Sequence, residues 1–390
     1  MVGCAGPRYF GFVTGGATPT ALAADWLTGT WDQNGALAAT SPAAAAAEAV
    51  ALGWCRELLG LPEQASGALV VGAQAANTLG VTIARDELLR RHDWDTLADG
   101  LAGGPPVQVV VGAERHTTVD RALRFAGLGE PAAVVDVGPD GAMDPRALDD
   151  AVATLDGPIL VCAQVGNVNS GAFDPLGEIV SVARAADAWV HVDGAFGLWA
   201  AASETRDQLV DGADGADSWV ADAHKWLNVP YDGALAFCAH AEAHLRTCAA
   251  QASYLPGDAG RDPMDWSQDA SRRARGIVLY ATLRALGRAG VSGLIDRCCD
   301  LAVDLGRRLD GREGLAVRNE IVLNQVVVSA GDRPRTDALI QAIQADGTCW
   351  VGPTTWRGEP AFRISVSNWS TTEADVERSA EAILGLAASI

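Results

Sequence analysis

Residues 189–197 read Trp-Val-His-Val-Asp-Gly-Ala-Phe-Gly. This apolar stretch ends in a carboxylate followed by small residues, and it is typical of a buried strand in a parallel sheet. Similar apolar runs alternate with helix-like stretches along the chain. Seven strands are predicted in this series, at 68–71, 107–111, 132–137, 158–163, 189–192, 218–221 and 234–238. The alternation predicts an α/β fold in which a mostly parallel seven-stranded sheet is covered by helices on both faces.

The regular alternation of strands and helices ends toward the C-terminus. Two helices are predicted at 270–286 and 293–309, and residues 315–390 mix short strands with helices, which indicates a small α+β domain. Residues 1–35 show little periodicity and predict an extended arm with loops. We therefore expect an N-terminal arm (1–40), a large domain (41–290) and a small C-terminal domain (291–390).

Composition narrows the classes of partner. The formal net charge of −20 at pH 7 disfavours binding to nucleic acid or anionic membranes. No apolar run is long enough to span a bilayer, and no secretory leader pattern begins the chain. The eight cysteines form no CxxC pair and no cluster with zinc-ligand spacing. We expect reduced thiols, no metal site and a cytoplasmic protein.

Two residues at the ends of consecutive predicted strands carry chemistry. Asp193 would project into the crevice beyond the sheet, where a buried carboxylate needs a cationic partner such as a protonated pyridine nitrogen. A helix cap or a structural hydrogen bond is the plain alternative. Lys225 follows the next strand and is the single lysine of the chain. Keeping an amine here indicates chemistry that guanidinium cannot perform, such as Schiff-base formation, although a surface lysine remains the alternative.

Two further strand ends are predicted to reach the same edge of the sheet. Gly72, Ala73 and Gln74 stand at a strand-to-helix turn, where small residues let backbone N–H groups approach a phosphate. His116 follows the strand at 107–111 and would be able to stack on a planar cofactor. A lone histidine after a strand is more often a cap or a surface residue. The prediction of a cofactor site therefore depends on all four strand ends meeting at one edge of the sheet.

This order and spacing resembles the group II pyridoxal-phosphate-dependent decarboxylases, which include aromatic-L-amino-acid decarboxylase and have the fold type I architecture. The most specific elements are His-Val-Asp-Gly-Ala at 191–195 and Asp-Ala-His-Lys-Trp at 222–226, and the likeness covers 7–390. The resemblance implies pyridoxal 5′-phosphate as cofactor, Lys225 as the Schiff-base lysine and Asp193 as the partner of the ring nitrogen. The other cofactor-binding residues that it implies are Ala195, His116, Gly72, Ala73, Gln74, Asn167, Asp222 and His224.

The resemblance also implies residues for the reaction. Tyr254 lies 29 residues past Lys225, where the family carries a tyrosine that returns a proton to the substrate carbon. Phenylalanine at that place accompanies oxidative chemistry in relatives, so Tyr254 favours simple decarboxylation, with His116 as a relay for the proton. Arg363, in the strand predicted at 362–367, would face the substrate carboxylate, with a structural ion pair as the equal alternative.

These expectations combine into one function. We expect a homodimer, with active sites at its interface, that decarboxylates an L-amino acid, with aromatic substrates favoured, to the amine and carbon dioxide. Transamination, carbon–sulfur lyase chemistry and cofactor binding without turnover stay open, because they share Lys225 and Asp193. The family's N-terminal helical segment, which clasps the dimer partner, is expected to be missing. The pattern does not identify the substrate.

Overall fold

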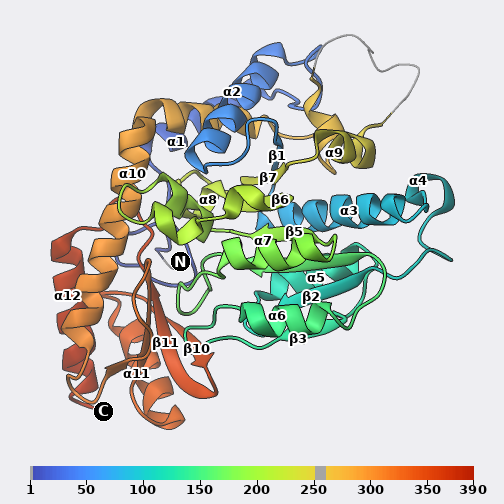
Figure 1. The fold of residues 1–390 in the computed structure, drawn as a ribbon. Helices are drawn as coiled ribbons and strands as arrows, with labels where there is room; N and C mark the ends of the chain where they lie inside the picture. Colours follow the sequence, from blue (N-terminus) through green and yellow to red (C-terminus); the bar gives the residue numbers. More distant parts are fainter. Residues whose placement is uncertain (1–2, 251–260) are drawn as a thin grey trace.

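A computed structural model describes residues 3–250 and 261–390, and two sheets organise them (Figure 1). The larger sheet has the strand order β1-β7-β6-β5-β4-β2-β3. Its strands are β1 (Ser66–Val70), β2 (Gln108–Gly112), β3 (Ala133–Val135), β4 (Ile159–Gln164), β5 (Trp189–Asp193), β6 (Ser218–Asp222) and β7 (Ala234–Cys238). Only β7 is antiparallel to its neighbours, so β1 points in the same direction as the other five strands. The predicted fold class is confirmed.

Helices cover both faces of this sheet, because alternate residues of a strand point to opposite sides. In β4, Leu160 and Cys162 pack in one apolar core with α3 (Ala73–Arg91) and α5 (Thr117–Phe125). Val161 and Ala163 belong to a second core with α6 (Pro145–Val152) and α7 (Leu176–Ala185). Trp189 lies in the first core, so the face of β5 that carries residues 189, 191 and 193 is the face that α3 covers.

The smaller sheet is antiparallel and has the order β10-β11-β9-β8. Its strands are β8 (Ala316–Val317), β9 (Gln325–Ser329), β10 (Gly352–Trp356) and β11 (Glu359–Ser365), and its helices are α11 (Arg333–Asp346) and α12 (Glu373–Ala387). The long α10 (Arg275–Leu309) joins the two parts and is interrupted at Gly287, whose φ of 62° lies in the left-handed region. The expected boundary at 290 falls just after this break, and the domain division itself stays a prediction.

The expected extended arm over 1–35 is wrong for residues 19–31. They form α1 (Pro19–Trp31), whose N-terminus is capped by the Thr18 hydroxyl and begins with proline. Ala21, Ala24 and Thr28 are buried on one face, but the exposed face is also apolar. The helix therefore lacks the alternation of polar and apolar faces on which the prediction depended.

The remaining elements are short, apart from α2. The helix α2 (Pro42–Leu58) has proline in its first turn, and the shorter helices are α4 (Thr96–Asp99), α8 (Ala223–Trp226) and α9 (Ala241–Cys248). Single 3₁₀ turns lie at Gly197–Ala202, Asp207–Val210, Ala213–Gly215 and Pro263–Trp266. Among the helices of the described ranges, none has the length and apolar character that crossing a bilayer requires.

Candidate active site

Predicted residues from four separate segments of the chain converge near one imidazole. Burial lowers the pKa of His116, and the charges of Asp193, Lys225, Arg363 and Asp222 act on the same ring. Asp193 ends β5, Asp222 and Lys225 stand at the end of β6 and the start of α8, and Arg363 lies on the smaller sheet. The structure therefore brings together the charged residues that the sequence placed at one edge of the sheet.

Asp193 ends β5 and is 4% exposed. Its Oδ2 accepts hydrogen bonds from Asn77 Nδ2 at 3.0 Å and Thr118 Oγ1 at 3.4 Å, and its Oδ1 accepts one from the backbone N–H of Ala195 at 3.2 Å. All three donors are neutral, and no ion pair to Asp193 occurs within the described residues. A buried carboxylate without a counterion is costly, so this site suits a cation supplied from outside the chain.

Asp222 ends the adjacent strand β6 and has different partners. Lys225 Nζ lies 2.9 Å from its Oδ2, and the two residues are three apart at the start of α8. The backbone N–H of Ala73 donates to Asp222 Oδ1 at 2.7 Å. One carboxylate therefore holds the amine of Lys225 against the first turn of α3.

The N-terminus of α3 has the character of an anion site. The first backbone N–H groups of a helix have no partner inside it, and they favour negative charge. A Cβ added at Gly72 would lie 3.4 Å from His224 Cε1, so the space between this turn and α8 is narrow. The Gln74 amide donates to Thr118 O at 3.3 Å, away from this space. A phosphate contact at Gly72, Ala73 and Gln74 stays a prediction, and it would use the backbone.

His224 packs between Asp222 and an aromatic ring that the sequence did not indicate. Its Nδ1 accepts the backbone N–H of Gly233 at 3.3 Å, so a neutral ring carries its hydrogen on Nε2, 3.6 Å from Asp222 Oδ1. Burial lowers the pKa of His224. Tyr231 lies over the imidazole with ring centroids 4.4 Å apart. An exposed tyrosine in a loop gives no pattern by which sequence reasoning would have found it.

The turn after Lys225 is fixed by residues that sequence reasoning also missed. Asn228 has a φ of 54°, a left-handed conformation that asparagine tolerates after a helix. Its amide donates to Ser367 O at 3.0 Å and accepts from the backbone N–H of Trp369 at 2.8 Å. A Cβ on Gly15 would collide with the Lys225 carbonyl oxygen, at 1.8 Å. The backbone at Gly15 and the connection between β11 and α12 therefore pack against the turn that follows Lys225 and fix its position.

Asn167 mainly stabilises its own loop. Its Oδ1 accepts the backbone N–H groups of Asn169 at 2.8 Å and Ser170 at 3.1 Å, and its Nδ2 donates to Glu114 O at 3.1 Å. One N–H of the amide remains for another partner. Its expected contact with cofactor or substrate stays a prediction, limited to that single hydrogen.

Arg363 is a half-buried cation on β11 without a carboxylate partner in the described part of the chain. Its Nη1 donates to Val168 O at 2.6 Å, while its buried Nε has no partner among the described residues. Burial lowers the pKa of Arg363 to about 10. The alternative of a structural ion pair therefore has no support within the described residues.

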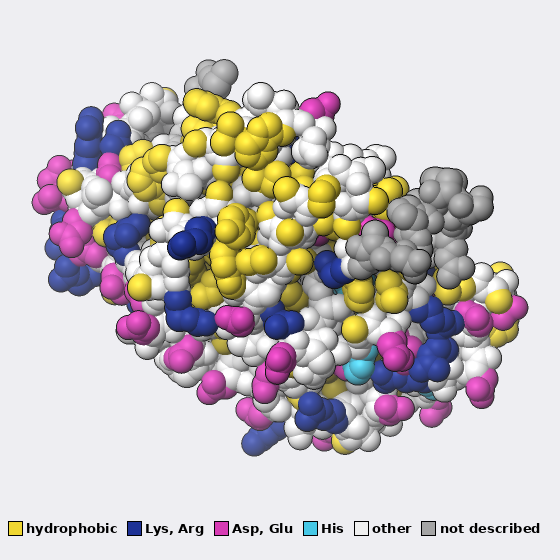
Figure 2. All heavy atoms as spheres, turned by 90° about the horizontal axis from the view of Figure 1, so that it is seen from above, with side chains coloured by type: hydrophobic (Ala, Val, Ile, Leu, Met, Phe, Trp, Pro, Cys, Tyr) yellow, Lys and Arg dark blue, Asp and Glu magenta, His cyan; other side chains and the backbone are white. Residues whose placement is uncertain are grey.

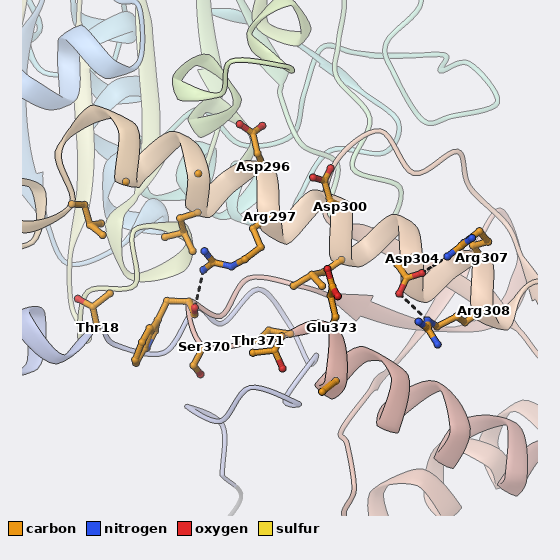
Figure 3. A pocket seen from close by; sticks show the side chains of 18 residues that line it. Thr18, Asp296, Arg297, Asp300, Asp304, Arg307, Arg308, Ser370, Thr371 and Glu373 are labelled. Carbon is orange, nitrogen blue, oxygen red and sulfur yellow. Dashed lines mark hydrogen bonds and ion pairs between the residues drawn. The ribbon is translucent and has the colours of Figure 1, made fainter.

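A cavity of about 1430 Å³ lies elsewhere, along the second half of α10 and the start of α12 (Figure 3). Its wall is held by Arg297, which donates to Trp369 O at 2.8 Å, and by Asp304, which pairs with arginines of the next turn. None of the predicted site residues lines it. The predicted site residues therefore lie apart from this cavity.

Residues 2–330 match the pyridoxal-dependent decarboxylase conserved domain. The chain belongs to this family. It is 29% identical over 406 residues to tryptophan decarboxylase 1 of Oryza sativa subsp. japonica, covering 94% of this chain and 78% of the relative. It is also 29% identical over 325 residues to the acidic amino acid decarboxylase GADL1 of Homo sapiens, covering 80% and 61%.

The fold comparison agrees with this assignment. The crystal structure of Oryza sativa TDC with PLP and tryptamine superposes with a TM-score of 0.92 at 26% identity, covering all of this chain and 85% of that one. The chain is thus a pyridoxal-phosphate-dependent amino-acid decarboxylase. The residues present fit the cofactor, because Asp193 has no counterion among the described residues and Lys225 lies beside the first turn of α3. Tyr254, the expected proton donor, lies outside the described residues.

Proposed function

We propose that the chain converts an aromatic L-amino acid to its amine and carbon dioxide. In this proposal Lys225 holds the cofactor, Asp193 pairs with its ring nitrogen, and Ala195 and His116 lie against its ring. The observation that carries it is the buried carboxylate of Asp193, which has only neutral donors and ends the strand next to β6, after which Lys225 follows. When bound, the cofactor withdraws electrons from the substrate Cα as the carboxylate leaves.

Each residue has a distinct task in this mechanism. Asp193 keeps a proton on the ring nitrogen, since its negative charge stabilises the cation. His116 Nδ1 accepts the Thr118 N–H at 3.3 Å and lies 2.8 Å from Thr118 Oγ1, whose hydrogen is shared between this nitrogen and Asp193, so a neutral ring presents its Nε2–H to the site. Burial lowers the pKa of His116, which keeps this ring neutral at pH 7. The amide groups of α3 and the neighbouring Asp222 and His224 would surround the phosphate.

Arg363 is the proposed partner of the substrate carboxylate. The side chain is half-buried, its buried Nε lacks a partner among the described residues, and its charge acts on His116 electrostatically. A guanidinium holds a carboxylate through two parallel hydrogen bonds, which fixes the direction of the bond to be broken.

An aromatic cluster supports the substrate class. Tyr9 stacks on Trp350 with ring centroids 4.8 Å apart, and Phe12 lies 6.1 Å from the same indole. From this cluster the chain continues to Gly15 at the Lys225 carbonyl, and Trp350 lies two residues before Gly352, which pairs with Arg363. If this aromatic surface lines the substrate site, it favours a planar side chain over an acidic one.

The single lysine makes the cofactor assignment sharply testable. Borohydride reduction of the loaded protein should fix the cofactor on one peptide, the one that contains Lys225, as read by mass spectrometry. Lys225→Arg keeps a cation near Asp222 and should abolish the label. A modified peptide elsewhere, or no labelled peptide at all, would disprove the assignment.

A panel of amino acids tests the substrate. Carbon dioxide release should be fastest with tryptophan, tyrosine or phenylalanine, and at least roughly tenfold slower with glutamate or aspartate, because an acidic side chain meets an aromatic surface. The reverse order would refute the aromatic proposal and leave decarboxylation intact. Keto-acid formation in place of carbon dioxide would indicate transamination.

Tyr254 is proposed as the residue that returns the proton after carbon dioxide leaves. Tyr254→Phe removes that proton donor, so dioxygen is expected to intercept the reaction and yield the aldehyde, ammonia and hydrogen peroxide in place of the amine. Oxygen uptake and peroxide assays measure the switch. A variant that still forms amine at the parental rate, without oxygen uptake, would show that another group supplies the proton.

A homodimer with active sites at its interface is the proposed assembly. Figure 2 shows hydrophobic side chains gathered on the face seen from above, the side where α1 and α2 lie in Figure 1. The exposed apolar residues of α1 are Leu22, Trp26, Leu27 and Trp31. Exposed apolar patches of this kind mark protein–protein contacts. The segment that leads into α1 passes the lysine, because a Cβ on Gly15 would collide with the Lys225 carbonyl oxygen.

Light scattering tests the assembly. The protein should have the mass of two chains, and Trp26→Asp combined with Leu27→Asp should yield monomers with reduced activity. Phe125→Asp, at an exposed position on α5, is the matched control and should stay dimeric. A protein that is monomeric and fully active at micromolar concentration would contradict the proposal.

The proposed location is the cytoplasm. Six of the eight cysteines are buried, and all eight are free thiols in the described residues. Reduced thiols are typical of a reducing compartment. Thiol titration of the unfolded, unreduced protein isolated from its own cells should therefore find eight thiols, and a lower count would contradict the proposal.

A further inference from the structure

A chain of buried hydrogen bonds leads along one face of β5 to Asp193. Trp189 Nε1 donates to Ser218 Oγ at 2.9 Å, and Ser218 Oγ lies 2.8 Å from His191 Nδ1. His191 Nε2 lies 2.9 Å from Asn77 Oδ1, and Asn77 Nδ2 donates to Asp193 Oδ2 at 3.0 Å. The four residues that lead to Asp193 along this path of hydrogen bonds are fully buried. Strand β5, strand β6 and helix α3 thus supply one continuous polar path inside an apolar core.

Elementary chemistry fixes the direction of every hydrogen in this path. An indole only donates, so the Ser218 oxygen accepts from Trp189 and its own hydrogen goes to His191 Nδ1. An ionised carboxylate only accepts, so the NH₂ of Asn77 faces Asp193 and its oxygen faces His191. The His191 ring must therefore carry its single hydrogen on Nε2. Burial lowers the pKa of His191 well below its usual range, which agrees with this neutral form.

The helix opposite is shaped for this imidazole. Gly80 lies on α3, and a Cβ added there would lie 2.5 Å from His191 Cε1 and 2.8 Å from Nδ1. Asn77 and Gly80 are three residues apart, so they lie on one face of the helix. The first residue bonds to the ring, and the second leaves room for it. This is an observation independent of the hydrogen bonds, and it indicates a site built around His191.

We propose that Ser218, His191 and Asn77 are positioning residues that keep Asp193 charged and aimed at the cofactor's ring nitrogen. The inference rests on the proposed role of Asp193. His191 forces the amide of Asn77 to present N–H groups to the carboxylate. Without that constraint Asn77 is free to rotate and turn its oxygen toward Asp193, where two acceptors repel. The carboxylate then loses a donor that stabilises its charge and fixes its direction.

The chain offers a matched control for this inference. His244 is also fully buried, its Nδ1 lies 2.9 Å from Ser66 Oγ, and burial lowers its pKa to about 4. Its Nε2, however, lies 2.8 Å from Trp266 O and does not lead to Asp193. Changes at His191 and His244 remove similar packing and hydrogen bonds, but only one of them touches the proposed path.

The experiment compares His191→Leu, His191→Gln and His244→Leu in the full chain, loaded with pyridoxal phosphate labelled with ¹⁵N in its ring. His191→Leu should weaken cofactor binding on the order of tenfold or more and move the ring-nitrogen chemical shift toward the unprotonated form. His191→Gln keeps a donor and an acceptor and should stay within about threefold of the parent. His244→Leu should lower stability without changing either signal.

Gly80→Ala tests the same path without removing any polar group. The added methyl displaces the imidazole, and we expect the ring-nitrogen shift to move in the same direction as in His191→Leu, by a smaller amount. This variant keeps the proposal testable if His191→Leu does not fold. A Gly80→Ala protein with the parental shift and affinity would count against the path.

The outcomes separate this inference from the proposed function. If Asp193→Ala loses the protonated ring signal but His191→Leu keeps it, the inference is wrong and the role of Asp193 stands. If Asp193→Ala also keeps it, the proposed role of Asp193 fails first. An equal effect of His244→Leu and His191→Leu would show that only core packing is involved, and it would overturn the positioning role.

Discussion

Asp193 and Asp222 end adjacent strands of one sheet, yet their partners differ in kind. Both carboxylates are almost completely buried, and each accepts a backbone N–H, from Ala195 at 3.2 Å and from Ala73 at 2.7 Å. Asp222 has the ammonium group of Lys225 at 2.9 Å, whereas Asp193 has only amide and hydroxyl donors. Asp222 is neutralised within the chain, and Asp193 is prepared for a cation that the chain does not supply.

The two aspartates at this edge of the sheet therefore have different functions. Asp222 fixes the position of the Lys225 amine, so removal of its charge should shift that amine. A carboxylate that awaits a ring nitrogen sets the electronic state of the cofactor, and removal of its charge affects the chemical step. The two aspartates should therefore respond differently to the same isosteric change.

The largest expected effect comes from Asp193→Asn. The neutral amide cannot stabilise a proton on the ring nitrogen, so kcat/KM should fall on the order of 1000-fold, about 4 kcal/mol of transition-state stabilisation. Asp222→Asn should cost only about tenfold, because Lys225 remains in place and loses one partner. Steady-state carbon dioxide release measures both. Equal losses in the two variants would erase the distinction between these carboxylates.

Arg363 extends the comparison to a half-buried cation. Like Asp193, it has no counterion among the described residues, and its Nε lacks a partner there. Arg363→Met should raise KM roughly 30-fold with a smaller change in kcat, because the lost contact is to the substrate carboxylate. Arg357→Met, an exposed arginine on the loop between β10 and β11, serves as control and should leave KM unchanged. A change in kcat alone would place Arg363 outside substrate binding.

The two strand ends could be predicted from the sequence, because a short apolar run shows where a buried strand stops. Asp193 and Lys225 follow directly from that pattern and from the scarcity of lysine. Their partners do not, since Asn77 and Thr118 belong to helices whose approach to the sheet depends on tertiary packing. The single lysine and the aspartate carried the prediction, and the hydrogen bonds that tune them required the fold.

The missed elements have similar physical reasons. The helix α1 is apolar on its exposed face as well, so it lacked a helical period. Strand β10 reads Gly-Pro-Thr-Thr-Trp and is mostly half-buried or exposed, which removes the apolar signal of a core strand. A sequence pattern shows which face of an element is buried in a core, and α1 and β10 both lie at the edge of a core.

Stability without cofactor should respond to the two aspartates with opposite signs. Asp193→Asn removes an unpaired buried charge, so the cofactor-free protein should gain about 2 kcal/mol in its free energy of unfolding. Asp222→Asn leaves Lys225 without its ion-pair partner and should lower that free energy by about 1 kcal/mol. Urea unfolding of cofactor-free protein measures both values. Destabilisation by both changes would mean that Asp193 is satisfied without a cation.

The smallest effect concerns pH and the histidine that leads to Asp193. Burial lowers the pKa of His191, so its unfolded form binds a proton at a higher pH than its folded form does. Stability from this group is fully present above the ordinary histidine value near pH 6.5 and is lost as pH falls toward the lowered folded value. Between pH 7 and pH 5.5 the loss should be about 1 kcal/mol, and His191→Gln, which does not titrate, should flatten the decline by that amount. His224, beside Asp222, is less buried and also has a lowered pKa, so His224→Gln should flatten the same decline less. A decline that His191→Gln leaves unchanged would mean that this imidazole is not kept neutral by the core that also holds Asp193.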